Sequence, residues 1–148
     1  MQSDLTTLPN GLRIISASRP GTESVSLGIW INTGSAREEE EINGLSHFLE
    51  HMVFKGTPTR TSFQIDAEIE DAGGQTNAYT SREITSFYAK MLKDDAELAL
   101  DVLADIVLNA SFPDEEVVKE RDVVIQEIKQ TIDTPDDIIF DYLQQQAY

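Results

Sequence analysis

The stretch GLSHFLEHMVFKG, Gly44 to Gly56, contains both histidines of this 148-residue chain, four positions apart with a glutamate between them. Positions four apart on an α-helix lie one turn above each other, so His47 and His51 should project side by side with Glu50 about 60° away. In this layout, H-x-x-E-H, the imidazoles can bind one Zn²⁺ and the carboxylate can act on a zinc-bound water. A histidine pair at this spacing can also serve packing or solubility alone. The lack of any other histidine, and of cysteine, favours metal binding.

The residues around the histidines predict an amphipathic helix. Asn43 is a suitable N-cap, and Lys55 to Pro58 should end the helix. Apolar residues follow helical spacing along one stripe: Leu45, Phe48, Leu49, Met52 and Val53. Because the histidines adjoin this stripe, we expect them at the rim of the core, where a metal ion would be shielded yet reachable.

Composition and charge restrict the class of protein. A chain of 148 residues with 40% hydrophobic residues has the size and composition of one globular domain. The net charge of −16, with 11 Lys and Arg against 27 Asp and Glu, argues against nucleic acid and anionic membranes as partners. No stretch reaches the roughly 18 apolar residues of a membrane span. Without cysteines, a zinc site must use nitrogen and oxygen ligands.

The N-terminal sequence MQSDLTTLPNGLRI has neither the basic and apolar regions of a signal peptide nor the Arg-rich character of a mitochondrial presequence. A mature cytoplasmic protein is therefore the simplest expectation. The mitochondrial matrix is the alternative, if a presequence has been removed.

Four β-rich runs predict two antiparallel hairpins. Residues 12–17 and 25–31 should pair with each other. Trp30 falls on the other face of the second run and should be half covered by packing. Residues 75–80 and 84–92 should form the second hairpin. The polar run QTNAYT suits an exposed sheet edge, either a plain one or one that accepts an extended peptide as an extra strand.

Apolar residues at helical spacing predict four further helices, beginning near residues 61, 94, 114 and 136. The first of these should bury Phe63, Ile65, Ile69 and Ala72. The helix after Pro113 carries an apolar stripe of Val117, Val118, Val124, Ile125, Ile128 and Ile132. With the hairpins, these helices predict an α+β fold, in which a mostly antiparallel sheet is packed with helices.

A catalytic zinc site needs three protein ligands and an open position for water. This chain has no third histidine, so the remaining donor must be a carboxylate. The helix after Pro113 places Glu116, Glu120 and Glu127 within about 40° of each other on one flank of its apolar stripe. Helical periodicity does not choose among these three.

Three segments of the chain resemble one protein family. GLSHFLEHMVFKGT, GGQTNAYTSREITSFY and ERDVVIQEI, in this order and spacing, resemble the pitrilysin family (M16) of inverzincin metallopeptidases, which includes the mitochondrial processing peptidase and bacterial relatives. The family signature joins H-x-x-E-H to a distant E-x6-E pair, and here Glu120 precedes Glu127 by seven residues. The resemblance runs from about Leu8 to the last residue.

The resemblance implies a role for each matching residue. The zinc ligands would be His47, His51 and Glu127. Glu50 would be the general base that takes a proton from the zinc-bound water. Glu120 would orient a ligand histidine through its other ring nitrogen. Asn77 and Ala78 match the edge strand on which family members hold a substrate peptide in extended form.

Family subunits contain two related α+β halves, and this chain ends inside the first. Residues 1–148 are therefore expected to be a single N-terminal catalytic-type domain, incomplete at its C-terminus, with the second half-domain absent. The expected function is a zinc-dependent endopeptidase acting on peptides or unfolded polypeptides, completed by the missing half-domain or a partner subunit and inactive as a fragment. The alternatives are a non-catalytic interaction or scaffold module, a processing-complex subunit with the same fold, and a purely structural zinc site.

Overall fold

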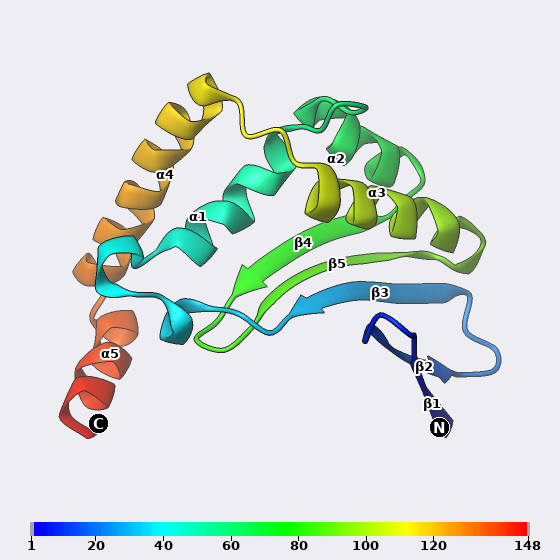
Figure 1. Ribbon diagram of the computed structural model, residues 1–148, viewed down its shortest axis with the longest axis horizontal. Helices are drawn as coiled ribbons and strands as arrows, with labels where there is room; N and C mark the ends of the chain where they lie inside the picture. Colours follow the sequence, from blue (N-terminus) through cyan, green and yellow to red (C-terminus); the bar gives the residue numbers. More distant parts are fainter. Residues whose placement is uncertain (1, 148) are drawn as a thin grey trace.

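A computed structural model describes residues 2–147 and shows antiparallel strands packed with helices (Figure 1). The strands are β1 Gln2–Thr7, β2 Arg13–Ser18, β3 Ser24–Ile31, β4 Gln75–Thr80 and β5 Thr85–Leu92. The helices are α1 Leu45–Met52, α2 Ser62–Asp71, α3 Ala96–Asn109, α4 Asp114–Asp133 and α5 Pro135–Ala147. The predicted α+β class is therefore confirmed. Within residues 2–147, no helix combines the length and the hydrophobicity that a transmembrane span requires.

β5 is the central strand of a three-stranded sheet in the order β3-β5-β4. It pairs antiparallel with β3, where Ile29 faces Phe87, and with β4, where Ala78 faces Phe87. Alternate residues of β5 point to one face, and Phe87, Ala89 and Met91 are at most 3% exposed there. The predicted second hairpin is confirmed, and β4 is an edge strand of the described sheet.

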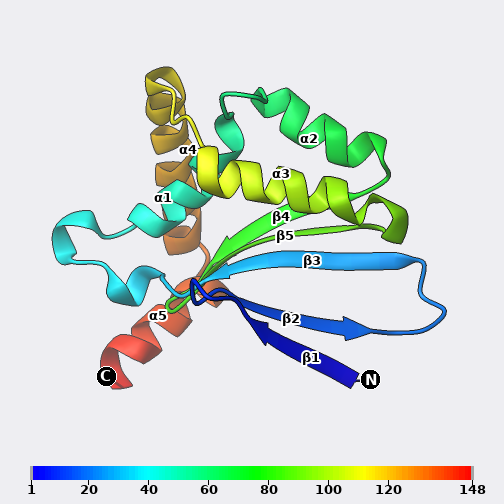
Figure 2. The same ribbon diagram turned by 45° about the vertical axis from the view of Figure 1, so that its right-hand side comes forward.

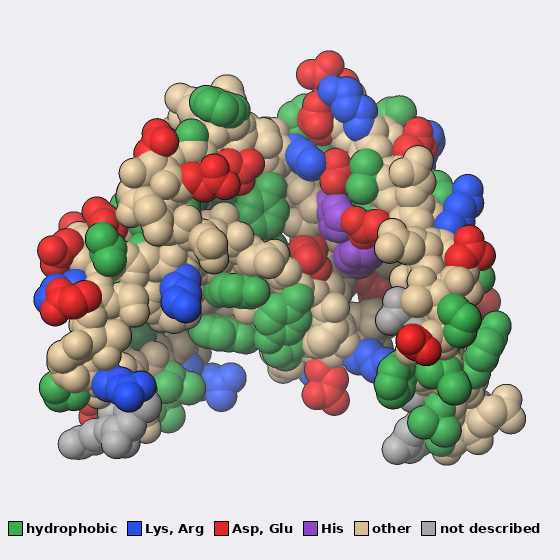
Figure 3. Space-filling model, turned by 180° about the vertical axis from the view of Figure 1, so that it is seen from behind, with side chains coloured by type: hydrophobic (Ala, Val, Ile, Leu, Met, Phe, Trp, Pro, Cys, Tyr) green, Lys and Arg blue, Asp and Glu red, His purple; other side chains and the backbone are tan. Residues whose placement is uncertain are grey.

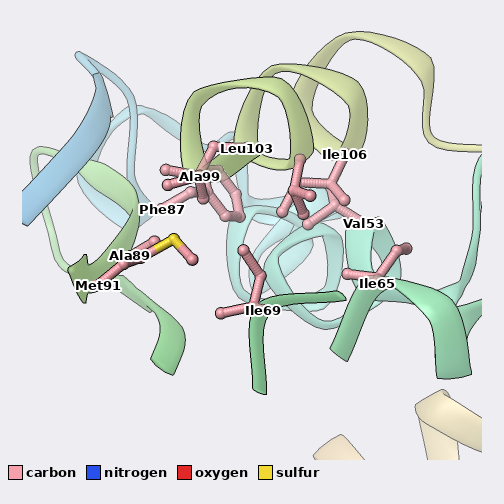
Figure 4. Close-up of a cluster of buried hydrophobic side chains, with 10 residues drawn as sticks. Val53, Ile65, Ile69, Phe87, Ala89, Met91, Ala99, Leu103 and Ile106 are labelled. Atoms are coloured by element: carbon pink, nitrogen blue, oxygen red, sulfur yellow. The ribbon is translucent and has the colours of Figure 1, made fainter. Parts of the chain in front are cut away.

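Helices α2 and α3 cover the buried face of this sheet (Figures 1 and 2). α2 begins at a capping box, in which Thr61 and Gln64 each accept the other's backbone N–H, and Gly73, with φ 74°, follows its C-cap Ala72. Figure 4 shows a hydrophobic cluster that joins α2 to β5 and α3, and it consists of Val53, Ile65, Ile69, Phe87, Ala89, Met91, Ala99, Val102, Leu103 and Ile106. This cluster fixes the helices on the sheet.

The first predicted hairpin is wrong. β2 pairs with β1, in a register that sets Leu5 opposite Ile15, and β3 pairs with β5 instead. A tight turn favours the β1–β2 pair, because Gly11 takes φ 89° and donates its N–H to the Leu8 carbonyl. The sequence did not predict β1, because QSDLTT contains one apolar residue and shows no alternation.

Two aromatic side chains that were expected to pack are exposed. Phe63 is 80% exposed, because it lies two positions from the fully buried Ile65 and therefore about 200° around the helix from it. Trp30 is 63% exposed. Its ring lies over Gly28, where an added Cβ would approach the ring to 2.6 Å. The tryptophan ring thus covers the Gly28 position of its own strand and leaves most of its surface in solvent.

α4 packs mainly against α1 and α5, to one side of the sheet (Figure 1). Its apolar stripe is therefore mostly exposed. The exposed members, at 41 to 56%, are Val118, Ile125, Ile128 and Ile132. The buried residues of α4 are Val124 and Glu120, so a carboxylate takes a place in the contact with α1 that an apolar residue would normally occupy.

Candidate metal centre

α1, which carries both histidines, is fixed at its N-terminus by a carboxylate from upstream in the chain. The N-cap is Gly44 in the left-handed conformation, φ 95°, and not Asn43 as predicted. The two carboxylate oxygens of Glu38 accept the backbone N–H groups of Gly44 and Ser46, each at 2.6 Å. Burial disfavours the ionised form of Glu38, but hydrogen bonds from Ser46 and Gly44 outweigh it and lower the pKa of this carboxyl. An ionised Glu38 therefore caps the histidine helix.

α4 crosses α1 so that Glu127 meets the two histidines. The Nε2 atoms of His47 and His51 lie 3.2 Å apart. Glu127 Oε2 lies 3.5 Å from His47 Nε2 and 3.4 Å from His51 Nε2. We call these three atoms the ligand triangle; they form a group that could hold a metal ion. Figure 3 shows the histidines at the surface, in purple, beside acidic side chains.

The ligand triangle has the dimensions of a zinc site. Zinc holds nitrogen and oxygen ligands at about 2.0 to 2.1 Å in tetrahedral geometry, which puts neighbouring ligand atoms about 3.3 to 3.4 Å apart. The observed sides of 3.2, 3.4 and 3.5 Å match this spacing. The side chains of His47 and Glu127 are 37% and 46% exposed, so solvent reaches two of the three ligand side chains, as a fourth position for water requires.

Glu120 is a buried carboxylate behind His51. Its Oε1 lies 2.9 Å from His51 Nδ1, and its Oε2 lies 2.7 Å from Lys55 Nζ. Burial opposes ionisation of Glu120, but hydrogen bonds from Lys55 and His51 outweigh it, so the pKa of this carboxyl is lowered. An ionised carboxylate only accepts hydrogen bonds. In the neutral imidazole, Nδ1 of His51 is therefore the nitrogen that donates to Glu120, which leaves the lone pair on Nε2, at the ligand triangle.

Glu50 directly precedes His51 in α1. Its Oε2 is buried and has no hydrogen-bond partner within residues 2–147. A buried polar atom left unpaired costs about 1 to 3 kcal/mol, so such an atom points to a partner that is not part of the chain. Glu50 shares α1 with both histidines, and an acceptor carboxylate on the ligand helix fits a catalytic zinc site, where a water molecule needs an acceptor.

The sequence left three glutamates of α4 as equal candidates, and the structure separates them. Glu127 lies at the histidines, and Glu120 lies behind His51. Glu116 accepts a hydrogen bond from Lys119 Nζ at 2.6 Å instead. α4 thus brings two of these carboxylates to His51, Glu127 at Nε2 and Glu120 at Nδ1, and only Glu127 adds an atom to the ligand triangle.

Asn77 and Ala78 lie on β4, the edge strand that neighbours α1. Thr80 Oγ1 at the end of β4 donates to the Ser46 carbonyl of α1 at 3.4 Å. Asn77 Oδ1 accepts the backbone N–H of Ala78 at 2.8 Å. The structure thus places these two residues on a strand that contacts the histidine helix, while the ligand triangle is made from α1 and α4.

Two residues that support this centre were not among those predicted. The sequence contains a signal for Lys55, because this residue follows His51 by four positions and continues the same helical face. Glu38 gave none, because the acidic run that it begins indicates a solvated loop and its contact with Ser46 spans eight residues.

Residues 13–148 match the family described as Insulinase (Peptidase family M16). A Bacillus subtilis protein named "Uncharacterized zinc protease YmxG" is 49% identical over 142 residues, which cover 96% of this chain and 35% of that protein. An Arabidopsis thaliana protein named "Probable mitochondrial-processing peptidase subunit beta, mitochondrial" is 46% identical over 147 residues, which cover 99% of this chain and 28% of that protein.

A solved protease structure is also similar to this chain. The crystal structure of a protease from Helicobacter pylori superposes with a TM-score of 0.88 at 27% identity, over 94% of this chain and 34% of that one. The chain thus spans about a third of the length of the proteins that it matches. On the match over residues 13–148, the chain belongs to peptidase family M16, the insulinase family.

Proposed function

We propose that this chain carries the zinc ligands and the catalytic glutamate of a zinc-dependent endopeptidase. The observation that carries the proposal is the ligand triangle of His47, His51 and Glu127, with sides of 3.2 to 3.5 Å. Three protein ligands with one open side are typical of catalytic zinc sites, whereas structural sites use four. Membership of a peptidase family and the zinc protease name of the B. subtilis relative support the same activity.

Each residue of the centre has a chemical role in this proposal. Zinc, when bound to His47, His51 and Glu127, supplies Lewis-acid polarisation of the scissile carbonyl and acidifies a water molecule. Glu50 Oε2 is the acceptor for the proton of the attacking water, and the same carboxyl can pass that proton to the leaving amine. Glu120 keeps the proton of His51 on Nδ1, so that Nε2 stays available as a ligand.

The proposed substrate is an extended peptide or an unfolded polypeptide. β4 is an edge strand of the described sheet and neighbours α1. An extended peptide can add to such an edge through main-chain hydrogen bonds, which would lead it past the zinc ligands. Asn77 and Ala78 are the residues that we propose to contact its backbone.

The whole enzyme is proposed to be larger than this chain. The chain covers 35% of the B. subtilis relative and 28% of the A. thaliana relative. We propose that residues 1–148 form one N-terminal catalytic-type domain, and that a second half-domain or a partner subunit completes the substrate chamber. The cytoplasm stays the predicted compartment and the mitochondrial matrix the alternative, because both bacterial and mitochondrial relatives match.

Zinc content and peptide cleavage test the proposal. The chain should hold one zinc ion, measured by plasma mass spectrometry after gel filtration, and His47→Ala should lose it. In the full-length parent protein, Glu50→Gln should keep zinc and lower peptide cleavage by about 10²- to 10⁴-fold, the usual contribution of an acid–base group. Cleavage by Glu50→Gln at the wild-type rate would overturn the mechanism.

Two other outcomes would replace the proposal. A full-length protein that binds zinc and cleaves no peptide would point to an interaction or scaffold module. Unfolding of the chain on removal of zinc, without any activity, would point to a structural zinc site.

A further inference from the structure

Lys55 lies just beyond α1, at the end of the 3₁₀ turn Val53–Lys55. It follows His51 by four residues and His47 by eight, so the three side chains lie along one side of the same helical path. Its Nζ is 2.7 Å from Glu120 Oε2, and its side chain is 24% exposed. Lys55 therefore binds the carboxylate that lies behind the ligand triangle.

Glu120 depends on this partner for its orientation. The residue is 7% exposed and lies between Lys55 on Oε2 and His51 on Oε1. A buried carboxylate without a cation is costly, and the terminal torsion of a glutamate side chain is soft. Without Lys55, the carboxyl group would be free to turn away from the imidazole. The ammonium group fixes one oxygen and thereby aims the other at His51 Nδ1.

On the basis of the zinc site proposed above, we propose that Lys55 is a positioning residue, which holds Glu120 in the orientation that keeps the proton of His51 on Nδ1 and offers Nε2 to zinc. Lys55 acts through Glu120 and contacts neither substrate nor metal. Hydrogen-bond partners of metal-ligating histidines contribute about 10- to 100-fold to metal affinity. Lys55 contacts Glu120 and not the histidine itself, so we expect it to contribute about tenfold to metal affinity, the lower end of this range.

Lys119 provides a matched control. It directly precedes Glu120 in α4, but its side chain is 64% exposed and pairs with Glu116 at 2.6 Å. Lys119→Met removes the same charge and leaves both partners of Glu120 in place. Lys55→Arg is the conservative variant, because a guanidinium can still donate to Glu120 Oε2.

The first measurement is the zinc dissociation constant of the 148-residue chain, obtained by competition with a chromophoric chelator. Lys55→Met should raise it about tenfold. Lys55→Arg should restore most of the affinity, and Lys119→Met should match the wild type. Glu120→Gln should lose at least as much affinity as Lys55→Met. Adding Lys55→Met to Glu120→Gln should cause no further loss, because the lysine acts through the glutamate.

The second measurement is the tautomer of His51, which a merely structural lysine would not change. Long-range ¹H–¹⁵N spectra of the metal-free chain should show the proton on Nδ1 in the wild type and in Lys119→Met. Lys55→Met should lose this preference. Circular dichroism of each metal-free variant reports whether it folds. Lys55→Gln, which keeps a polar side chain, is a second variant, and its zinc affinity and His51 tautomer are measured in the same way.

The outcomes separate this inference from the proposed function. Wild-type zinc affinity and the wild-type tautomer in folded Lys55→Met or Lys55→Gln would overturn the role of Lys55 and leave the proposed zinc site intact. Additive losses in the double variant would overturn the route through Glu120. A wild-type chain that binds no zinc would overturn both proposals.

Discussion

Two buried carboxylates of this chain differ in how the protein satisfies them. Asp105 on α3 is 8% exposed and Glu120 on α4 is 7% exposed. Asp105 accepts hydrogen bonds of 2.8 to 3.0 Å from four residues, Thr57, Thr59, Arg60 and Asn109. Glu120 instead links Lys55 to His51, whose second nitrogen faces the other two atoms of the ligand triangle.

The difference indicates what each cluster is for. Burial raises the pKa of Asp105, but its hydrogen bonds from Asn109, Arg60 and two threonines outweigh it and hold the pKa well below the ordinary value. All four of these hydrogen bonds join Asp105 to other residues of the protein. Together they tie the segment after α1 to α3. The candidate metal centre has converging ligand atoms, and Glu50 Oε2, on the same helix as the histidines, has no hydrogen-bond partner among the described residues. A surface pocket lies over the Asp105 cluster, whose polar groups already bond to each other. The presence of a pocket is therefore weaker evidence for a ligand site than the converging ligand atoms of the other cluster.

The largest expected effect is on zinc binding. Glu127→Ala removes one of three ligand atoms, so the chain should no longer retain zinc. The unfolding free energy of the metal-free chain should change by less than about 0.5 kcal/mol, because Glu127 is 46% exposed. Zinc content after gel filtration and urea unfolding measure the two effects. Glu116→Ala, on the same flank of α4, should bind zinc like the wild type, and zinc retention by Glu127→Ala would mean that the histidines use another donor.

Asp105→Ala should show the opposite pattern. It should lower the unfolding free energy by about 3 kcal/mol, because Arg60 Nη1 and the hydroxyl groups of Thr57 and Thr59 lose the acceptor that Asp105 provides, and it should still bind zinc. Asp101 also pairs with Arg60, but it is 68% exposed. Asp101→Ala should therefore cost less than about 1 kcal/mol. Equal losses in the two variants, measured by urea unfolding, would contradict the difference in burial on which the comparison rests.

The sequence predicts the histidine half of the metal centre because H-x-x-E-H fixes side-chain directions within one helix. It does not choose the third ligand. Glu116 and Glu127 share a flank of α4, yet they lie about 16 Å apart along its axis at about 1.5 Å per residue. Which turn of α4 lies next to His47 depends on where α4 crosses α1. Helical periodicity contains no information on that crossing, and the family resemblance supplied the choice.

Non-local contacts also explain the errors in the fold. Residues 25–31 were expected to pair with the neighbouring run 12–17, whereas Ile31 pairs with Thr85, far along the chain. The shared core beneath α2 and α3 decides this pairing, and a local turn signal cannot reveal it. The cap of α1 is a similar case. Asn43 satisfies the local rule for an N-cap, but a carboxylate six residues before Gly44 takes the role.

Glu38 offers the smallest expected effect, because it supports the metal centre without belonging to it. Glu38→Gln keeps one acceptor oxygen and loses the charge and the second acceptor. It should lower the unfolding free energy by about 1 kcal/mol at neutral pH, as the loss of a helix cap does, and should leave zinc binding in place. Glu39→Gln, at the exposed neighbouring position, is the control and should match the wild type.

The pH dependence of this loss distinguishes an ionic cap from a polar one. The folded pKa of Glu38 is lower than its value in the unfolded chain, about 4.3. The ionised form therefore contributes its stability above the unfolded pKa, and the contribution is lost as the pH falls through the folded pKa. The difference in unfolding free energy between wild type and Glu38→Gln should be full at about pH 7 and shrink steadily below about pH 4. A difference that persists unchanged in acid would show that hydrogen bonding alone, without charge, holds the histidine helix in place.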